Sequence, residues 1–389
     1  MIFRPSTLAV TAVLAALGCG DGTDVHLGVG PPLQLVQPDG GGGSGGAAVD
    51  ASDDAATCDD STRVEPEVAA FLIECEGFGC NAIGGREGCR YEVTTSADAG
   101  PGSLREGLEL VRPAWITFST DFDIILETNL VARSHKTLDG RNRRVTIRDF
   151  GIRIENAENI AIENITFLGR QDLDRDAGGV RKDDADAISL VGAGTHDVWI
   201  DHCDFSNYRD GLIDVSGGAT NVTVSRSHFS DHEFVMLFGN DVDDVGAREM
   251  RVTVHHNWFQ ATKNYHPRAR YGWIHVYNNL FDEWGDVGVR ASQESRVYTE
   301  KNIYRAGDDS KEAVTFTKEG DDDKDGFVRA AGDDLKLNGA VVNTNDDGTV
   351  VMLPFPYEYH PQTADDGGDG GGLLEQRLHS EAGVQAPLP

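Results

Sequence analysis

The sequence has few cationic residues relative to its acidic ones. Of its 389 residues, 34 are Lys or Arg and 65 are Asp or Glu, which gives a formal net charge of -31. This balance excludes nucleic-acid binding through a general positive field. An anionic substrate can still be held, but only by a local cationic pocket or through a bridging metal ion.

Long apolar stretches with helical spacing are also scarce. Hydrophobic residues make up 39% of the chain and aromatic residues 8%, and there are 46 glycines. This composition favours many short strands joined by turns over long helices.

The first residues resemble an export signal. Arg4 provides the basic start, residues 8–17 are apolar but too short to span a bilayer, and small residues precede Cys19. We expect residues 1–19 to be a signal peptide of the bacterial lipoprotein kind, with Cys19 lipidated. Ordinary secretion with cleavage nearby is the alternative. The protein is therefore expected to be exported, either secreted or anchored to the cell surface or outer membrane, and to touch a membrane only through this lipid.

Residues 20–63 are rich in Gly, Asp and Ala and are expected to form a flexible tether before a single domain at 64–389. We expect this domain to be monomeric. Cysteines 58, 75, 80 and 89 are expected to form two disulfides, with all three pairings open. Cys203 lies apart from them and is expected to be a buried, inert thiol.

A repeat runs through the middle of the chain. Six short segments end in an aromatic residue in the same register, at intervals of 22 to 38 residues. These closing aromatics are Phe167, Phe205, Phe229, Phe259, Phe281 and Tyr304. A repeat of this length predicts a solenoid with one coil per repeat, and the absence of long helical patterns between the segments favours an all-β parallel β-helix over a β-propeller or a βαβ fold.

The position two residues before each aromatic predicts an internal column. Asn257, Asn279 and Asn302 occupy it in the last three repeats, where stacked amides can hydrogen-bond from coil to coil. Ile165, Cys203 and Ser227 interrupt the ladder in the earlier repeats.

Four carboxylates form two close pairs. Asp184 lies two residues from Asp186, and Asp210 lies four residues from Asp214. In extended chain both spacings place the paired side chains on one face. Such a cluster repels itself unless it holds a cation, and all-oxygen ligands favour calcium over zinc. Nearby histidines lack the helical spacing of a zinc site.

A second acidic segment, residues 321–326, begins like a calcium-binding loop. Gly332 stands where such a loop needs a bidentate Glu, so we interpret the segment as a solvated loop.

Several motifs in one order carry a resemblance to a known family. They are Gly84-Gly85, Gly102-Ser-Leu-Arg105-Glu, Asp184-Ala-Asp186-Ala-Ile, Val198-Trp-Ile-Asp-His202, Asp210-Gly-Leu-Ile-Asp214, Asp231-His-Glu-Phe-Val-Met-Leu-Phe-Gly239, His255-His-Asn257 and Pro267-Arg-Ala-Arg270-Tyr-Gly272. Over residues 64–383 the chain resembles the pectate lyase superfamily of polysaccharide lyase family 1.

The resemblance implies a right-handed parallel β-helix and a calcium-dependent, exported enzyme that cleaves polygalacturonate by β-elimination. It implies that Asp184, Asp186, Asp210 and Asp214 bind calcium. It also implies that Arg270, the distal Arg of the family motif Arg-x-Pro-x-x-Arg, grips a substrate carboxylate.

Two positions depart from the family pattern. Tyr265 stands where the family has the Arg that removes the C5 proton, and Phe234 replaces a substrate-binding Lys. Lys263 and Arg268 are nearby but out of register. We take Tyr265 as the candidate catalytic residue, the alternative being that it stacks on a sugar ring. Two other functions stay open: a surface glycan-binding protein that has lost catalysis, and a glycoside hydrolase on the same fold, which would cut with paired carboxylates.

Overall fold

The computed structural model describes residues 63–65, 69–171, 186–351, 353–363 and 373–386. The chain divides into residues 1–50, which lie outside this description, and residues 51–389. The expected signal peptide and nearly all of the expected tether therefore fall outside the described residues. None of the described helices is long and apolar enough to cross a membrane.

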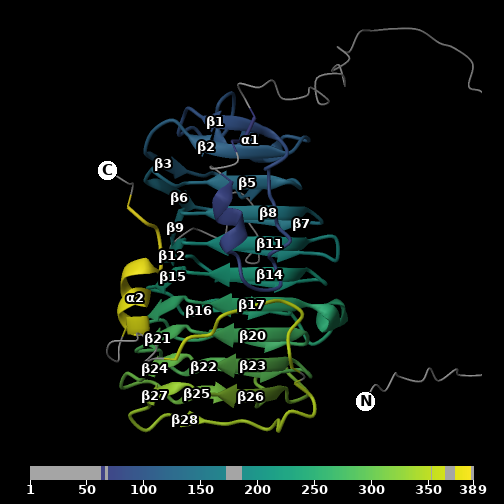
Figure 1. Cartoon of the computed structure of the whole chain (residues 1–389), viewed down its shortest axis with the longest axis vertical. Coiled ribbons are helices and arrows are strands. Elements are labelled where there is room, and N and C mark those ends of the chain that lie inside the picture. The colour runs from purple at the N-terminus through teal and green to yellow at the C-terminus, as the bar shows by residue number, and fades with distance from the viewer. Residues whose placement is uncertain (1–62, 66–68, 172–185, 352, 364–372, 387–389) are drawn as a thin grey trace, which may run out of the picture. The chain divides into compact units, whose positions relative to one another are not determined.

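The described residues form a parallel β-helix, as the repeat predicted. Each coil contributes one strand to each of three parallel sheets, and the coils stack along one axis (Figure 1). Sheet A contains β1 (Cys89–Val93), β2 (Ala114–Phe118), β5 (Lys136–Asp139), β8 (Glu158–Glu163), β11 (His196–Asp201), β14 (Thr220–Ser225), β17 (Arg251–His255), β20 (Trp273–Tyr277), β23 (Arg296–Glu300) and β26 (Phe327–Ala331).

The other two sheets have nine strands each. Sheet B contains β3 (Phe122–Ile125), β6 (Val145–Asp149), β9 (Thr166–Gly169), β12 (Asp204–Ser206), β15 (His228–Ser230), β18 (Trp258–Gln260), β21 (Leu280–Asp282), β24 (Ile303–Arg305) and β27 (Asp334–Lys336). Sheet C contains β4 (Leu130–Val131), β7 (Ile152–Glu155), β10 (Ile188–Val191), β13 (Gly211–Ser216), β16 (Phe234–Phe238), β19 (Arg268–Arg270), β22 (Val287–Ser292), β25 (Glu312–Thr315) and β28 (Val341–Val342).

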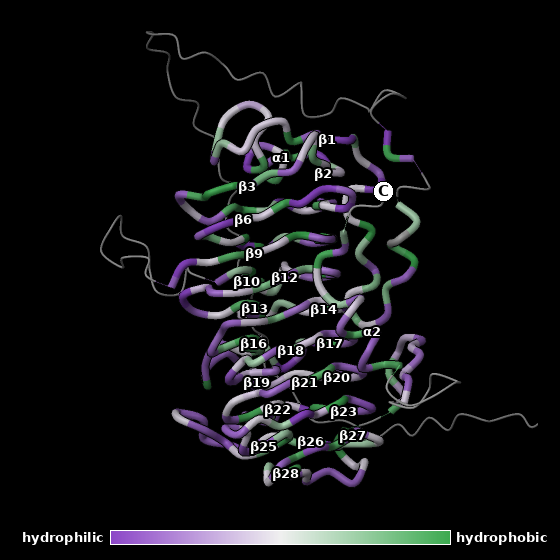
Figure 2. Tube along the Cα trace, turned by 90° about the vertical axis from the view of Figure 1, so that its left-hand side faces the viewer, coloured by the Kyte–Doolittle hydropathy of each residue, from purple (hydrophilic) through white to green (hydrophobic). Residues whose placement is uncertain are grey.

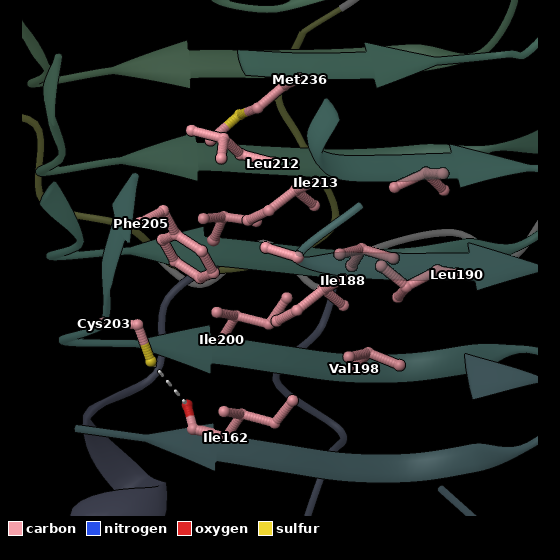
Figure 3. Packing of buried hydrophobic residues seen from close by; sticks show 14 of the residues in the cluster. Ile162, Ile188, Leu190, Val198, Ile200, Cys203, Phe205, Leu212, Ile213 and Met236 are labelled. Carbon is pink, nitrogen blue, oxygen red and sulfur yellow. Dashed lines mark hydrogen bonds between the residues drawn. The ribbon is translucent and has the colours of Figure 1, made fainter. Parts of the chain in front are cut away.

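The closing aromatics of the repeat stack inside the solenoid. Successive rings from Phe167 to Tyr304 lie 4.6 to 5.0 Å apart and nearly parallel. This spacing matches the separation of neighbouring strands, so the repeat places each ring on the next. Figure 3 shows Phe205 among the buried aliphatic side chains of neighbouring coils, with Cys203 beside them. Cys203 is a free, buried thiol, as expected.

The predicted asparagine ladder is present between sheets A and B. Asn257 Nδ2 donates to Asn279 Oδ1, and Asn279 Nδ2 donates to Asn302 Oδ1, each at 3.0 Å. The amides are fully buried, and each also donates to a backbone carbonyl. Buried polar side chains need such partners, so the ladder fixes the register of the last coils.

Short helices and the chain ends cover other parts of the solenoid. The helix α1 (Leu104–Glu109) lies over the first coil, and its start is capped by Ser103 Oγ, which accepts from the Glu106 amide at 3.2 Å. A 3-10 helix, η1 (Ala70–Glu74), begins a segment whose Leu72 packs on Trp115 and Trp199 of sheet A. The 3-10 helix η3 (Val245–Glu249) precedes β17.

The C-terminal residues also return to the solenoid. The helix α2 (Leu373–Glu381) lies along the side of the solenoid (Figures 1 and 2). It buries Leu374 and Leu378 against Leu280 and Ile303. Phe355 packs against Tyr298 on sheet A. The described N-terminal and C-terminal segments thus cover sheet A or sheet B, and the outer face of sheet C carries the predicted site.

One disulfide of the N-terminal segment is described. Cys75 is bonded to Cys80, and Cys89 is also disulfide-bonded. The first bond selects among the three pairings left open by the sequence.

Candidate active site

Three of the four predicted carboxylates come together where strands of sheet C begin. Asp186 lies two residues before β10, Asp210 directly precedes β13, and Asp214 lies on β13. The Ser189 hydroxyl and the Gly211 amide each donate to Asp186, both at 2.8 Å. Ser189 is paired with Asp214 across the two strands. The fourth, Asp184, lies outside the described residues.

Gly211 leaves the space between two of these carboxylates open. A Cβ atom at this position would lie 2.5 Å from Asp214 Oδ1 and 3.2 Å from Asp186 Oδ1. Asp214 Oδ1 is buried and accepts no hydrogen bond from the described residues. Burial and the negative charges of Asp186 and Asp210 raise the pKa of Asp214 well above its usual value. A buried carboxylate oxygen without a donor, facing a second carboxylate, fits a hard cation such as calcium.

Cationic side chains lie on the same face of sheet C. The strand register runs from Asp214 through Leu237 to Arg268 and then to Arg290. Arg270 lies two residues after Arg268 on β19 and therefore faces the same way. Neighbouring strands are about 4.8 Å apart, so Asp214 and Arg268 are roughly 10 Å apart along the row. This arrangement supplies the local positive charge that an acidic protein needs to hold an anion.

Tyr265 and Phe234 lie next to each other beside this row. Their ring centroids are 4.9 Å apart. The Arg268 guanidinium lies 5.2 Å from the Tyr265 ring centroid, and Arg268 Nη1 donates to the Tyr265 hydroxyl at 2.7 Å. Arg268, which is out of register in the sequence, therefore reaches position 265 with its side chain.

Comparison with known proteins identifies the family. The family model described as pectate lyase matches residues 125–365. The chain belongs to the pectate lyase family.

Plant pectate lyases are among the relatives of this family member. Pectate lyase 5 of Ambrosia artemisiifolia is 34% identical over 285 residues, which cover 69% of each chain. The pectate lyase of Nicotiana tabacum is 35% identical over 255 residues, 61% of this chain and 64% of that protein.

Solved structures agree with the fold. The cedar pollen allergen Jun a 1 superposes with a TM-score of 0.66 at 27% identity, over 82% of this chain and 95% of that one. A Bacillus pectate lyase, solved in complex with trigalacturonate, gives a TM-score of 0.63 at 22% identity over 80% and 98% of the two chains.

Arg270, the predicted substrate-binding residue, is buried in this family member. Its Nε donates to Asp322 Oδ1 at 2.6 Å, and its Nη1 donates to the carbonyls of Gly239 and Asn240 at 3.2 and 3.0 Å. Asp322 lies on the loop between β25 and β26. Sequence reasoning missed this partner, because residues 321–326 suggested only a degenerate calcium loop.

Another acidic group lies on sheet A, away from this site. Glu163, Asp201 and His202 are close enough to share an ion, but Asp201 already accepts from Arg226 Nη2 at 2.9 Å and also hydrogen-bonds His202 and Ser225. The four histidines weighed for zinc, His232, His255, His256 and His266, form no such group among the described residues. These contacts support a structural role for Asp201 and His202.

Proposed function

We propose that the protein is a calcium-dependent polysaccharide lyase that cleaves polygalacturonate, or a related acidic glycan, by β-elimination. Family membership supports a lyase acting on pectate. The observation that carries the finer proposal is the arrangement on the outer face of sheet C. Asp214 lies in the same strand register as Arg268 and Arg290, and Asp186 and Asp210 lie beside Asp214. This face offers both groups that a uronate carboxylate needs: ligands for a bridging cation and guanidinium donors.

Different residues of the chain would take different roles in the elimination reaction. Asp186, Asp210, Asp214 and Asp184 would hold the ion, and Arg270 would orient the substrate carboxylate. A calcium ion held there would supply positive charge to that carboxylate, onto which electron density moves from C5. When the C5 proton leaves, its electron pair forms the C4–C5 double bond, the C4–O4 bond breaks, and the leaving oxygen takes a proton from water.

Tyr265 is the proposed base for the C5 proton. Its hydroxyl accepts a hydrogen bond from Arg268 at 2.7 Å. This hydrogen bond fixes the position of the phenolic oxygen, which must lose its own proton before it can take another. Phe234 fixes the ring by packing on it.

A surface glycan-binding protein without catalysis is the second candidate. The observation in its favour is that the two family side chains replaced at positions 234 and 265 leave no amine or guanidine at either position. A glycoside hydrolase on the same fold is a third candidate, because it would also use paired carboxylates, and Asp186 and Asp214 lie close together beside Gly211.

One absorbance assay on polygalacturonate tests these candidates. A lyase produces an unsaturated product that absorbs in the ultraviolet and stops producing it when calcium is chelated. A hydrolase yields only new reducing ends, and a binding protein yields neither. Absence of the ultraviolet signal at any calcium concentration would refute the proposal.

We also propose that the chain is exported as a monomer and carries a lipid on Cys19. The apolar stretch before Cys19 supports this proposal. Mass spectrometry of the mature N-terminus from the native host tests it, because ordinary secretion would leave an unmodified N-terminus.

A further inference from the structure

Arg268, Arg270 and Arg290 on sheet C are already occupied by carboxylates of the chain itself. Asp322 Oδ1 accepts from Arg270 at 2.6 Å, and Asp322 Oδ2 accepts from Arg268 Nη2 at 2.8 Å. Glu319 Oε2 lies 3.1 Å from Arg290 Nε. The Asp322 side chain has no exposed surface, and those of Arg268 and Arg270 are 6% and 11% exposed. A substrate carboxylate can therefore replace Asp322 at Arg270 only if Asp322 moves away.

Asp322 makes the kind of contact expected of a bound sugar acid. One carboxylate bridges two guanidinium groups with an oxygen on each, through charge-assisted hydrogen bonds of 2.6 and 2.8 Å. The hydrogen bonds from Arg270 and Arg268 hold the pKa of Asp322 below its usual value although burial alone would raise it. The residue therefore stays ionised and competes as an anion.

The segment that carries Asp322 is attached to the solenoid through polar contacts. We call residues 317–326 the acidic strap. The amides of Gln293 and Glu294 donate to the carbonyls of Lys324 and Asp325, each at 3.0 Å, and the Lys324 amide donates to Gln293 Oε1 at 2.7 Å. Asp321, Asp323, Lys324 and Asp325 are exposed. The charged residues around the buried Asp322 are exposed, and segments held by solvent-exposed backbone hydrogen bonds open at a lower free energy than the core.

We propose that the acidic strap is a built-in competitor of the substrate: Asp322 occupies the carboxylate subsite of Arg268 and Arg270, and the strap is displaced when a uronate binds there. The inference rests on the proposed function, because it names the residue that limits access to the same site. It assigns to Asp322 control of substrate affinity, with the chemistry left to other residues.

The variant Asp322→Asn tests the competition. The amide keeps the size of the side chain but removes its charge, so trigalacturonate in the presence of calcium should bind about tenfold more tightly, a change of roughly 1.4 kcal/mol. The KM on polygalacturonate should fall while kcat changes little. Asp321→Asn is the matched control, because it makes the same charge change on an exposed residue of the same strap. A purely structural ion pair predicts the opposite: weaker binding and a lower melting temperature.

Hydrogen exchange on the wild-type protein tests displacement without any substitution. Adding trigalacturonate should accelerate exchange of the Gln293, Glu294 and Lys324 amides, because their acceptors move away with the strap. Slower or unchanged exchange at these amides in the bound protein would overturn the proposal. If neither the wild type nor Asp322→Asn binds trigalacturonate with calcium present, the proposed function fails as well. If the wild type binds and Asp322→Asn binds no more tightly, the competition alone is refuted.

Discussion

Replacing Asp214 by Asn should stabilise the metal-free protein and weaken its binding of calcium. Asp214 Oδ1 and Asp186 Oδ1 both lie within 3.2 Å of the Gly211 Cβ position, so they are at most twice that distance apart. Two unit charges at this separation repel by roughly 2.5 kcal/mol at an effective dielectric constant of 20. The amide removes this repulsion, and with it one ligand charge.

The stability difference between Asp214→Asn and the wild type should depend on pH. The pKa of Asp214 is raised on folding. Its contribution to stability is therefore fully present below the ordinary Asp pKa and is lost as the pH rises through the folded value, at about 1.4 kcal/mol per pH unit between the two. The variant should match the wild type at pH 4 and exceed it at pH 8 with chelator present.

Denaturant unfolding in the presence of chelator measures the change in stability, and calorimetric titration with calcium measures the change in affinity. The control is Asp123→Asn, which removes one charge from an exposed position on sheet B. The reasoning is wrong if Asp214→Asn loses stability at pH 8 without metal, or if it binds calcium as tightly as the wild type.

Three further predictions concern Tyr265 and Glu163. Tyr265→Phe should lower kcat by about 100-fold or more with little change in KM, because the proposed base is lost; full activity in the absorbance assay would exclude Tyr265 as the base. Tyr265→Arg should not raise activity and should lower the melting temperature, because the new guanidinium would lie against Arg268, which now donates to the hydroxyl at 2.7 Å. Restored family-level turnover would contradict this. Glu163→Gln should leave stability unchanged at pH 4 and increase it at pH 8. Burial and Asp201 raise the pKa of Glu163 well above its usual value, and Glu163 Oε2 is buried with no partner among the described residues. Urea unfolding at the two pH values checks it, and equal stabilities at pH 8 would show that Glu163 carries no such penalty.

The fold could be predicted because each coil repeats the same side chains. An aromatic ring that recurs in one register must meet its counterpart in the next coil, and a buried Asn column is stable only if the amides bond to one another. The same logic placed Asp186, Asp210 and Asp214 together, since residues before and on adjacent parallel strands share an edge of the sheet. These predictions needed only the period and the strand direction.

The contacts around the arginines could not be predicted in this way. Asp322 lies 52 residues after Arg270 in a loop that belongs to no repeat, so no periodicity links the two. The sequence places Arg268 out of register, because an alignment counts positions along the backbone. The long side chain of Arg268 nevertheless reaches the hydroxyl of Tyr265, three residues earlier in the chain. Both contacts depend on loop course and side-chain direction, which a repeat does not encode.

The departures from the family pattern form one connected set of contacts, which favours an altered enzyme over a degenerate one. Phe234 packs on Tyr265, Tyr265 accepts from Arg268, and Arg268 shares Asp322 with Arg270. Random loss of catalysis would remove the Lys and the Arg independently, with no reason for their replacements to contact each other or a neighbouring guanidinium. Here the positive charge absent from position 265 is present on Arg268 within hydrogen-bonding distance. The guanidinium next to position 265 therefore comes from Arg268, which lies on the face that carries the carboxylates.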